Sequence, residues 1–117
     1  MDRIAEESLL FDYYGNLLTE KKRRVMELYH EENLSLSEIA EEFGITRAAV
    51  HDSLKSARKQ LADYEARLGL VEQMGRRTSM LRTIEESVLR IEKAHAEDQE
   101  LCRKLAQIRS TLAELGE

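Results

Sequence analysis

The sequence predicts an all-α protein, a helix-turn-helix bundle with a long fourth helix and further helices after it. The composition supports this fold class: charged residues make up 35% of the 117 residues, aromatic residues 5%, and proline and tryptophan are absent. Apolar residues recur at spacings of three and four, and no stretch alternates as a strand does. The stretch SEIAEEFGITRAAV at residues 37–50 has the pattern of two helices joined by a glycine turn.

Two helices are expected before this motif. Asp2 is suited to cap the first, over residues 3–15, and Gly15 is suited to stop it. The second helix opens at Thr19 and runs to about Glu31, where the segment EENLS interrupts the apolar pattern.

The motif itself carries strong local signals. Ser35 and Glu38 have the spacing of a capping box, in which each side chain accepts a backbone N–H of the other residue. We expect Gly44 to end the short helix in the left-handed conformation and Thr46 to cap the next helix. The turn and the buried wedge of the motif are assigned to Ile39, Ala40, Gly44, Ile45 and Val50.

The helix after the motif is long and carries an apolar stripe with alternating spacings of four and three. Gly69 is its expected C-cap. The sequence therefore predicts a helix-turn-helix domain over residues 1–69 and a C-terminal helical extension over residues 70–117. The stripe consists of Val50, Leu54, Ala57, Leu61, Tyr64 and Leu68.

In the extension, Gly75 marks a weak break, after which Thr78 or Ser79 is suited to cap a new helix. The apolar pattern slips around the segment AHAEDQ. With Asp98 available as a cap, we favour two helices over one between residues 78 and 115. The two resulting seams are Leu81, Ile84, Val88 and Ile91, and then Leu101, Leu105, Ile108, Leu112 and Leu115.

These seams either pack on the first domain or join two copies of the chain. We expect a homodimer, because three apolar seams exceed what a small core needs and helix-turn-helix proteins commonly pair to match two half-sites. Cys102 lies in a leucine-rich helix and is expected to be a small, semi-buried side chain.

The overall charge limits the partners and the compartment. A net charge of −5 argues against a general basic nucleic-acid binder but leaves room for a local basic face, since salt screens charge over about 10 Å. No apolar run reaches the ~20 residues of a membrane span, and the acidic start MDRIAEESLL is unlike a signal peptide. With a single cysteine, these features favour a cytoplasmic protein without membrane insertion.

A local basic face is present around the motif. Arg47 and His51 occupy positions from which a recognition helix reads bases, whereas Ala48 and Ala49 offer little beyond a methyl group. The segment KKRR at residues 21–24 fits a solvated helix face and a phosphate contact equally well. The candidate nucleic-acid-binding residues are Lys21, Lys22, Arg24, Arg47, His51, Lys55 and Arg58.

No catalytic, cofactor or metal site is expected. The segment YHEEN lacks the second histidine of a zinc-binding HExxH motif, and the chain has no glycine-rich phosphate loop or serine elbow. We therefore expect a protein that is not an enzyme.

The stretch LLTEKKRRVMELYHEENLSLSEIAEEFGITRAAVHDSLKSARKQL resembles region four of bacterial sigma factors, although no other sigma region fits in the chain. A closer resemblance, over roughly residues 8–72, is to the YlxM family of small bacterial helix-turn-helix-like proteins. FDYYGNLLTEKK, LSLSEIAEEFGITRAAVHDSLK and LADYEARLGL carry it. The resemblance implies a regulatory role and a link to the signal recognition particle pathway, inferred for the family from neighbouring genes.

Two hypotheses follow. The first is a DNA-binding regulatory protein, with DNA preferred over RNA, that takes part in the signal recognition particle pathway. The alternative is an adaptor that binds protein or RNA of the signal recognition particle and reads no DNA sequence. Arg47 and the basic face favour the first hypothesis, and the alanines at 48 and 49 favour the second.

Overall fold

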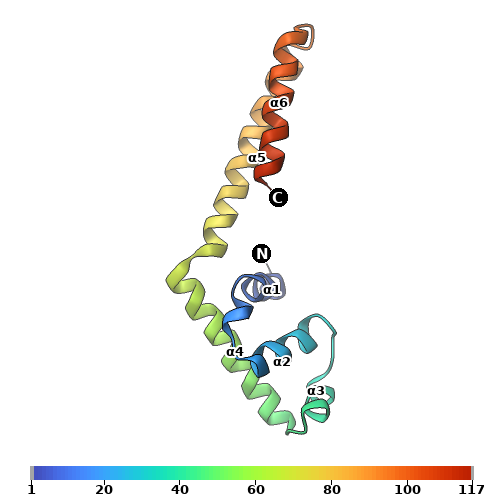
Figure 1. The fold of residues 1–117 in the computed structure, drawn as a ribbon, viewed down its shortest axis with the longest axis vertical. Coiled ribbons are helices and arrows are strands. Elements are labelled where there is room, and N and C mark those ends of the chain that lie inside the picture. The colour runs from blue at the N-terminus through green and yellow to red at the C-terminus, as the bar shows by residue number, and fades with distance from the viewer. Residues whose placement is uncertain (1, 117) are drawn as a thin grey trace. The chain divides into compact units, whose positions relative to one another are not determined.

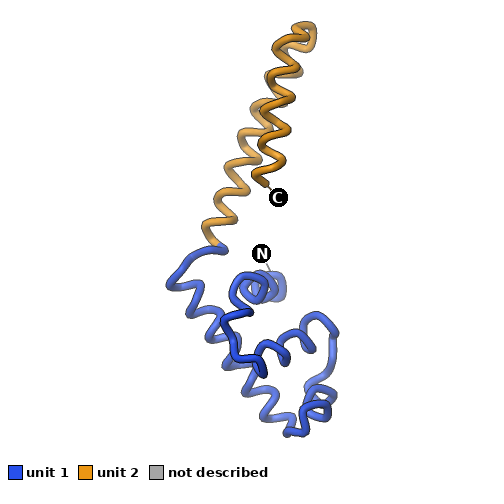
Figure 2. Tube along the Cα trace, viewed as in Figure 1, with its two compact units in different colours: residues 1–71 blue, residues 72–117 orange. Residues whose placement is uncertain are grey.

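The computed structural model describes residues 2–116, and every regular element within them is helical (Figure 1), which confirms the all-α prediction. The chain divides into two compact units, residues 1–71 and 72–117 (Figure 2). The elements in chain order are α1 (Arg3–Tyr14), the short 3-10 helix η1 (Gly15–Leu17), α2 (Glu20–His30), α3 (Leu36–Phe43), α4 (Arg47–Leu68), α5 (Leu70–Ala94) and α6 (Gln99–Leu115).

The first unit is organised around α4, which packs against α1, α2 and α3. The apolar stripe of α4 supplies Val50, Leu54, Ala57 and Leu61 to the core, all nearly inaccessible to solvent. Tyr14, Val25, Met26, Leu28 and Ile39 meet them from the other helices, each at most 1% exposed. The predicted stripe on α4 therefore packs within its own chain from Val50 to Leu61, whereas its last member, Leu68, is 55% exposed.

Side-chain caps begin the helices where the sequence predicts them. Asp2, Thr19, Thr46 and Asp98 each accept a backbone N–H from the first turn of the helix that follows. Ser35 and Glu38 form the complete capping box, with bonds of 3.1 and 3.0 Å. The predicted starts of α2, α3, α4 and α6 are thus confirmed.

Glycines end α3 and α4 as predicted. Gly44 has φ 66° and Gly69 has φ 61°, both in the left-handed region where an L side chain is strained. Gly15 differs, because its φ is −56° and the backbone simply continues into η1. A Cβ at Gly15 would lie 3.0 Å from the ring of Phe11, so close packing against that ring is the feature of the fold that favours glycine there.

The predicted break near Gly75 is wrong, because α5 runs unbroken from Leu70 to Ala94. Thr78 and Ser79 therefore lie inside a helix and cap nothing. A glycine in a helix interior costs only about 1 kcal/mol relative to alanine. Its neighbours Glu72, Gln73 and Met74 are good helix formers, so this cost does not end the helix.

Contacts from distant residues start α5. The hydroxyl of Tyr14 donates to Glu65 Oε1 (2.6 Å) and accepts the backbone N–H of Leu70 (3.1 Å). The same carboxylate oxygen accepts the N–H of Val71 (3.0 Å). The first two N–H groups of α5, which a helix cannot satisfy internally, thus find partners on α1 and α4.

In the second unit, α5 and α6 lie side by side as a hairpin (Figure 1). The predicted pair of helices is confirmed, since α5 ends at Ala94 and α6 begins after Asp98. Val88 and Leu105 are the buried apolar side chains on the described part of this unit. A salt bridge joins the helices, with Arg109 Nη2 3.1 Å from Glu92 Oε2.

Candidate nucleic-acid interface

The helix-turn-helix is formed by α3, the turn at Gly44 and α4. Ile39 and Val50 are 0% exposed, Ala40 is buried and Ile45 is half-buried, so the wedge residues lie between the two helices. The N–H of Ile45 donates to the carbonyl of Ala40 (3.0 Å), which gives the turn the six-to-one bond of a Schellman motif. These contacts fix α4 as the second helix of the motif.

A basic stripe lies on the outer side of α4. Arg47, His51, Lys55 and Lys59 follow one another at intervals of four residues, and all four are exposed. Residues four apart share one face of a helix, with a rise of about 6 Å per step. Within residues 2–116, Arg47, Lys55 and Lys59 have no ion-pair partner, and His51 Nδ1 lies 3.8 Å from Asp52 Oδ1. We call these four residues the α4 stripe.

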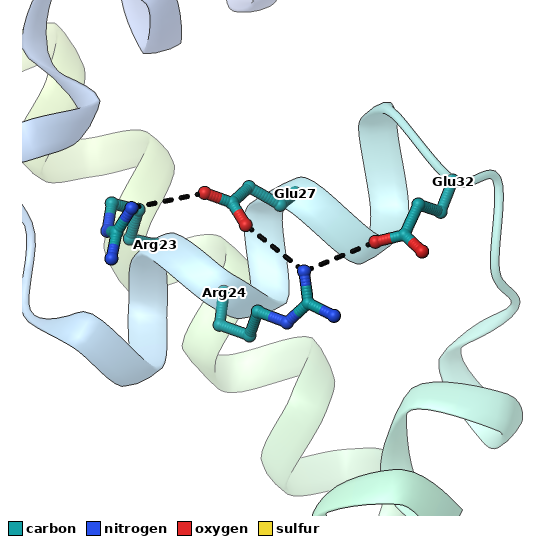
Figure 3. A network of polar contacts seen from close by, with 4 residues as sticks. All are labelled: Arg23, Arg24, Glu27 and Glu32. Carbon is teal, nitrogen blue, oxygen red and sulfur yellow. Dashed lines mark hydrogen bonds and ion pairs between the residues drawn. The ribbon is translucent and has the colours of Figure 1, made fainter.

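The basic segment of α2 has fewer side chains free to contact phosphate than its sequence suggests. Arg24 Nη1 lies 3.2 Å from both Glu27 Oε2 and Glu32 Oε2, and Arg23 Nη1 lies 3.3 Å from Glu27 Oε1 (Figure 3). The hydrogen bond to Glu27 raises the pKa of Arg24 above its usual value. Lys21 and Arg24 are both exposed and Lys22 is half-buried, but only Arg24 of these three forms ion pairs among the described residues.

Arg58, another candidate, is held in a cluster at the side of α4. Its Nε lies 3.3 Å from Glu7 Oε1, and its guanidinium carbon lies 5.6 Å from the centre of the Tyr29 ring. The side chain is 32% exposed. Glu7 lies 51 residues earlier in the chain, so no local pattern could have revealed this pairing.

Acidic side chains surround the first helix of the motif. Between residues 25 and 44 there is no lysine or arginine. The capping hydrogen bonds from Ser35 lower the pKa of Glu38 and hold its carboxylate charged. A polyanion that approached the motif would therefore be repelled by α3 and attracted by the α4 stripe. The acidic residues are Glu27, Glu31, Glu32, Glu38, Glu41 and Glu42.

The described residues also bear on metal ligands, membrane-spanning helices and the cysteine. Residues 2–116 contain no group of three His, Cys, Asp or Glu side chains placed to hold a metal ion. None of the described helices combines the length and the apolar character that crossing a membrane requires. Cys102 is half-buried as predicted, with Sγ 3.3 Å from the carbonyl oxygen of His95.

Comparison with known proteins finds one matching family and several bacterial proteins that carry its name. The family described as "Putative helix-turn-helix protein, YlxM / p13 like", UPF0122, matches residues 1–102. A UPF0122 protein of Desulforamulus reducens is 51% identical over 81 residues, 69% of each chain. One of Halalkalibacterium halodurans is 41% identical over 88 residues, 75% of this chain and 81% of its own. A UPF0122 protein of Bacillus cereus is 32% identical over 108 residues, which cover 92% of this chain and 98% of its own.

Proposed function

The chain belongs to the UPF0122 family of YlxM/p13-like helix-turn-helix proteins, and on that premise we propose that it is a non-enzymatic regulatory protein that binds nucleic acid through α4. DNA is the preferred ligand, because the motif presents a helix suited to the major groove. The signal recognition particle pathway, which the YlxM resemblance implies, is the proposed cellular setting.

One observation carries this proposal. Arg47, Lys55 and Lys59 are exposed on one side of the second motif helix, and none has an ion-pair partner among residues 2–116. When unpaired lysine and arginine side chains contact DNA phosphates, the counterions bound to those phosphates are released. This release supplies most of the affinity of proteins that bind DNA with little sequence specificity. Arg24 and Arg58 already contact carboxylates, so we assign them a minor share of the binding.

Sequence discrimination is expected to be modest. Arg47 and His51 are the two members of the stripe that lie in the first turns of α4, where base contacts are made. One good bidentate contact is worth about 1–3 kcal/mol of discrimination, and the alanines at 48 and 49 add little to it.

Salt titration of binding to duplex DNA and to hairpin RNA tests the proposal. Replacing Lys55 and Lys59 by alanine should weaken DNA binding and lower the log–log salt slope by about one unit for each phosphate that a lysine no longer neutralises. Arg47→Ala should also reduce any sequence preference. The matched control is Arg103→Ala with Lys104→Ala, which removes the same charge from α6 in the second unit and should leave the salt slope unchanged.

Absence of binding to both ligands at low salt would refute the proposal. The adaptor hypothesis would then take its place, with protein or RNA of the signal recognition particle as partner. The acidic surface of α3 and the two alanines favour it, because a protein partner with a basic face would fit α3 better than a nucleic acid does.

We also propose that the second unit pairs with a second copy of the chain. A two-helix hairpin is too small to form a core of its own, and Ile84, Ile91, Ile108 and Leu115 are each 42–48% exposed. Ile108→Asp should shift the protein towards monomer in sedimentation equilibrium, whereas Ser110→Asp, at an exposed position two residues later, should not. A wild-type chain that remains monomeric at high concentration would rule out pairing.

A further inference from the structure

A hollow in the first unit is lined in part by Arg58, to which the function proposed above assigns only a minor share of the binding. It measures about 590 Å³ and is formed by the start of α1, the end of α2 and the adjoining loop, and the middle of α4. Polar and charged groups make up much of its wall. Its lining residues are Arg3, Ile4, Glu7, Tyr29, His30, Asn33, Leu34 and Arg58.

Three cationic or titratable side chains share one carboxylate in this wall. Glu7 Oε1 lies 3.7 Å from Arg3 Nε and 3.3 Å from Arg58 Nε. Glu7 Oε2 lies 3.4 Å from His30 Nε2. With His30 neutral, two arginines face a single glutamate, so the lining carries one net positive charge.

The carboxylate does not satisfy all of these donors. His30 Nε2 and Arg58 Nε are both buried, yet neither makes a hydrogen bond to a described residue, because their directions towards Glu7 are poor. The His30 side chain is only 10% exposed. A buried nitrogen left without a hydrogen bond costs about 1–3 kcal/mol, so a ligand that accepts hydrogen bonds from both nitrogens would stabilise this wall.

We propose that this hollow binds a phosphate-class oxyanion, held by Arg3 and Arg58, with His30 Nε2 as a further donor. Glu7 occupies the arginines in the absence of the anion, and the anion replaces it on them. Guanidinium groups suit this ligand, because each offers several N–H donors in a planar fork that matches phosphate oxygens. The anion could arrive as a free phosphate compound or as a phosphate of a nucleic-acid backbone.

Binding should leave a signature on His30. Burial lowers the pKa of His30, Arg58 lowers it further, and Glu7 opposes both. Arg3 and Arg58 are the other charged groups that face the ring, and Tyr29 packs edge-on to it at 5.2 Å. A phosphate dianion beside the ring favours the protonated form, so the pKa of His30 should rise when the site is filled.

The test uses the full-length chain and inorganic phosphate, followed by NMR of the His30 ring. Sodium chloride of equal ionic strength is the reference. Phosphate should shift the His30 signals and raise their titration midpoint. Arg58→Gln and Arg3→Gln should each weaken binding about tenfold or more, as expected for loss of a charge-assisted hydrogen bond. Glu7→Gln should tighten binding, because it removes the resident competitor.

Arg23→Gln is the matched control, since Arg23 lies on α2 outside the hollow and contacts Glu27. It should leave phosphate binding unchanged. Arg3 is 88% exposed and its ion pair is with Glu7, so Arg3→Gln keeps the test valid even if Arg58→Gln fails to fold. No phosphate effect beyond that of chloride, in wild type and in Glu7→Gln, would overturn the inference. So would an equal loss of binding in Arg23→Gln.

A second arm identifies the source of the phosphate and separates this inference from the proposed function. If free phosphate binds and Arg3→Gln leaves duplex binding unchanged, the ligand is a small phosphate compound. If Arg3→Gln weakens duplex binding as well, the hollow takes a backbone phosphate. Replacing Lys55 and Lys59 should affect duplex binding alone, so failure of one proposal does not imply failure of the other.

Discussion

Three glycines of this chain allow the cost of a left-handed backbone to be measured without interference from packing. Gly44, Gly69 and Gly75 have one property in common: a Cβ added at any of them would meet nothing within 4 Å. They differ in conformation, because φ is 66° at Gly44 and 61° at Gly69, whereas Gly75 lies inside α5. An alanine at each position therefore tests the backbone alone.

The expected magnitudes follow from the conformations. An L residue held in the left-handed region loses roughly 1–2 kcal/mol, and alanine recovers about 0.4–1 kcal/mol by restricting the unfolded chain. Gly44→Ala and Gly69→Ala should each lower the free energy of unfolding by about 1 kcal/mol. Gly75→Ala should raise it by up to about 1 kcal/mol, because alanine is the better helix former. Gly44→Asn should cost less than Gly44→Ala, since asparagine tolerates this conformation.

The assay is urea denaturation followed by two signals. All four tyrosines, at residues 13, 14, 29 and 64, lie in the first unit, so tyrosine fluorescence reports that unit alone. Far-ultraviolet circular dichroism reports the helices of both units. Gly44→Ala and Gly69→Ala should change the urea midpoint measured by fluorescence. Gly75→Ala should change only the urea midpoint measured by circular dichroism. An unchanged fluorescence midpoint in Gly44→Ala would refute the left-handed turn and with it the placement of the motif.

Three further predictions use the same signals. Tyr14→Phe removes the hydroxyl that binds the start of α5 and should cost about 1–3 kcal/mol, seen as a lower urea midpoint in dichroism. Ser35→Ala removes the cap of α3 and should lower the free energy of unfolding, measured by fluorescence, by about 1 kcal/mol. Ser37→Ala, at an exposed position inside α3, should lower it by less. Because the pKa of His30 is lowered in the folded chain, the unfolded chain binds a proton first as pH falls through about 6.5. Wild type should therefore lose more stability than His30→Gln between pH 7.5 and 5.5, and equal losses would exclude this contribution.

Local signals in the sequence are sufficient for most of the first unit. A cap such as Ser35 or Thr46 acts on a backbone group three residues away, so the sequence alone contains both partners. The same holds for Gly44, whose conformation depends on the absence of its own Cβ. The motif and the boundaries of α2, α3 and α4 could therefore be predicted closely.

Features that depend on distant contacts could not be predicted. The start of α5 at Leu70 depends on the hydroxyl of Tyr14, 56 residues earlier, and the sequence around residue 70 contains no cap that would replace it. The break predicted at Gly75 is wrong for a different, local reason: a glycine costs only about 1 kcal/mol in a helix interior, and its neighbours are good helix formers.

The sequence predicts the candidate site as a set of charged residues. The structure separates the cations that form ion pairs from those that do not. Their spacing of four places Arg47, His51 and Lys55 on one helix face, and the structure shows that all three are exposed. Arg24 and Arg58 contact Glu27, Glu32 and Glu7. The sequence shows where the charges are but not which acidic side chain the fold brings to each of them, so it overestimates the number of free cations.

The contacts of Tyr14 at the start of α5 also bear on the order in which the chain folds. The N–H of Leu70 finds its partner, the hydroxyl of Tyr14, only after α1 and α4 have come together, whereas the partner of Val71 is the nearby Glu65 on α4. A chain emerging from the ribosome exposes α1 to α4 before most of α5, and domains generally fold in that order during synthesis. The first unit can therefore act as a template on which α5 begins, and Tyr14→Phe should delay helix formation in α5 relative to the first unit in refolding experiments.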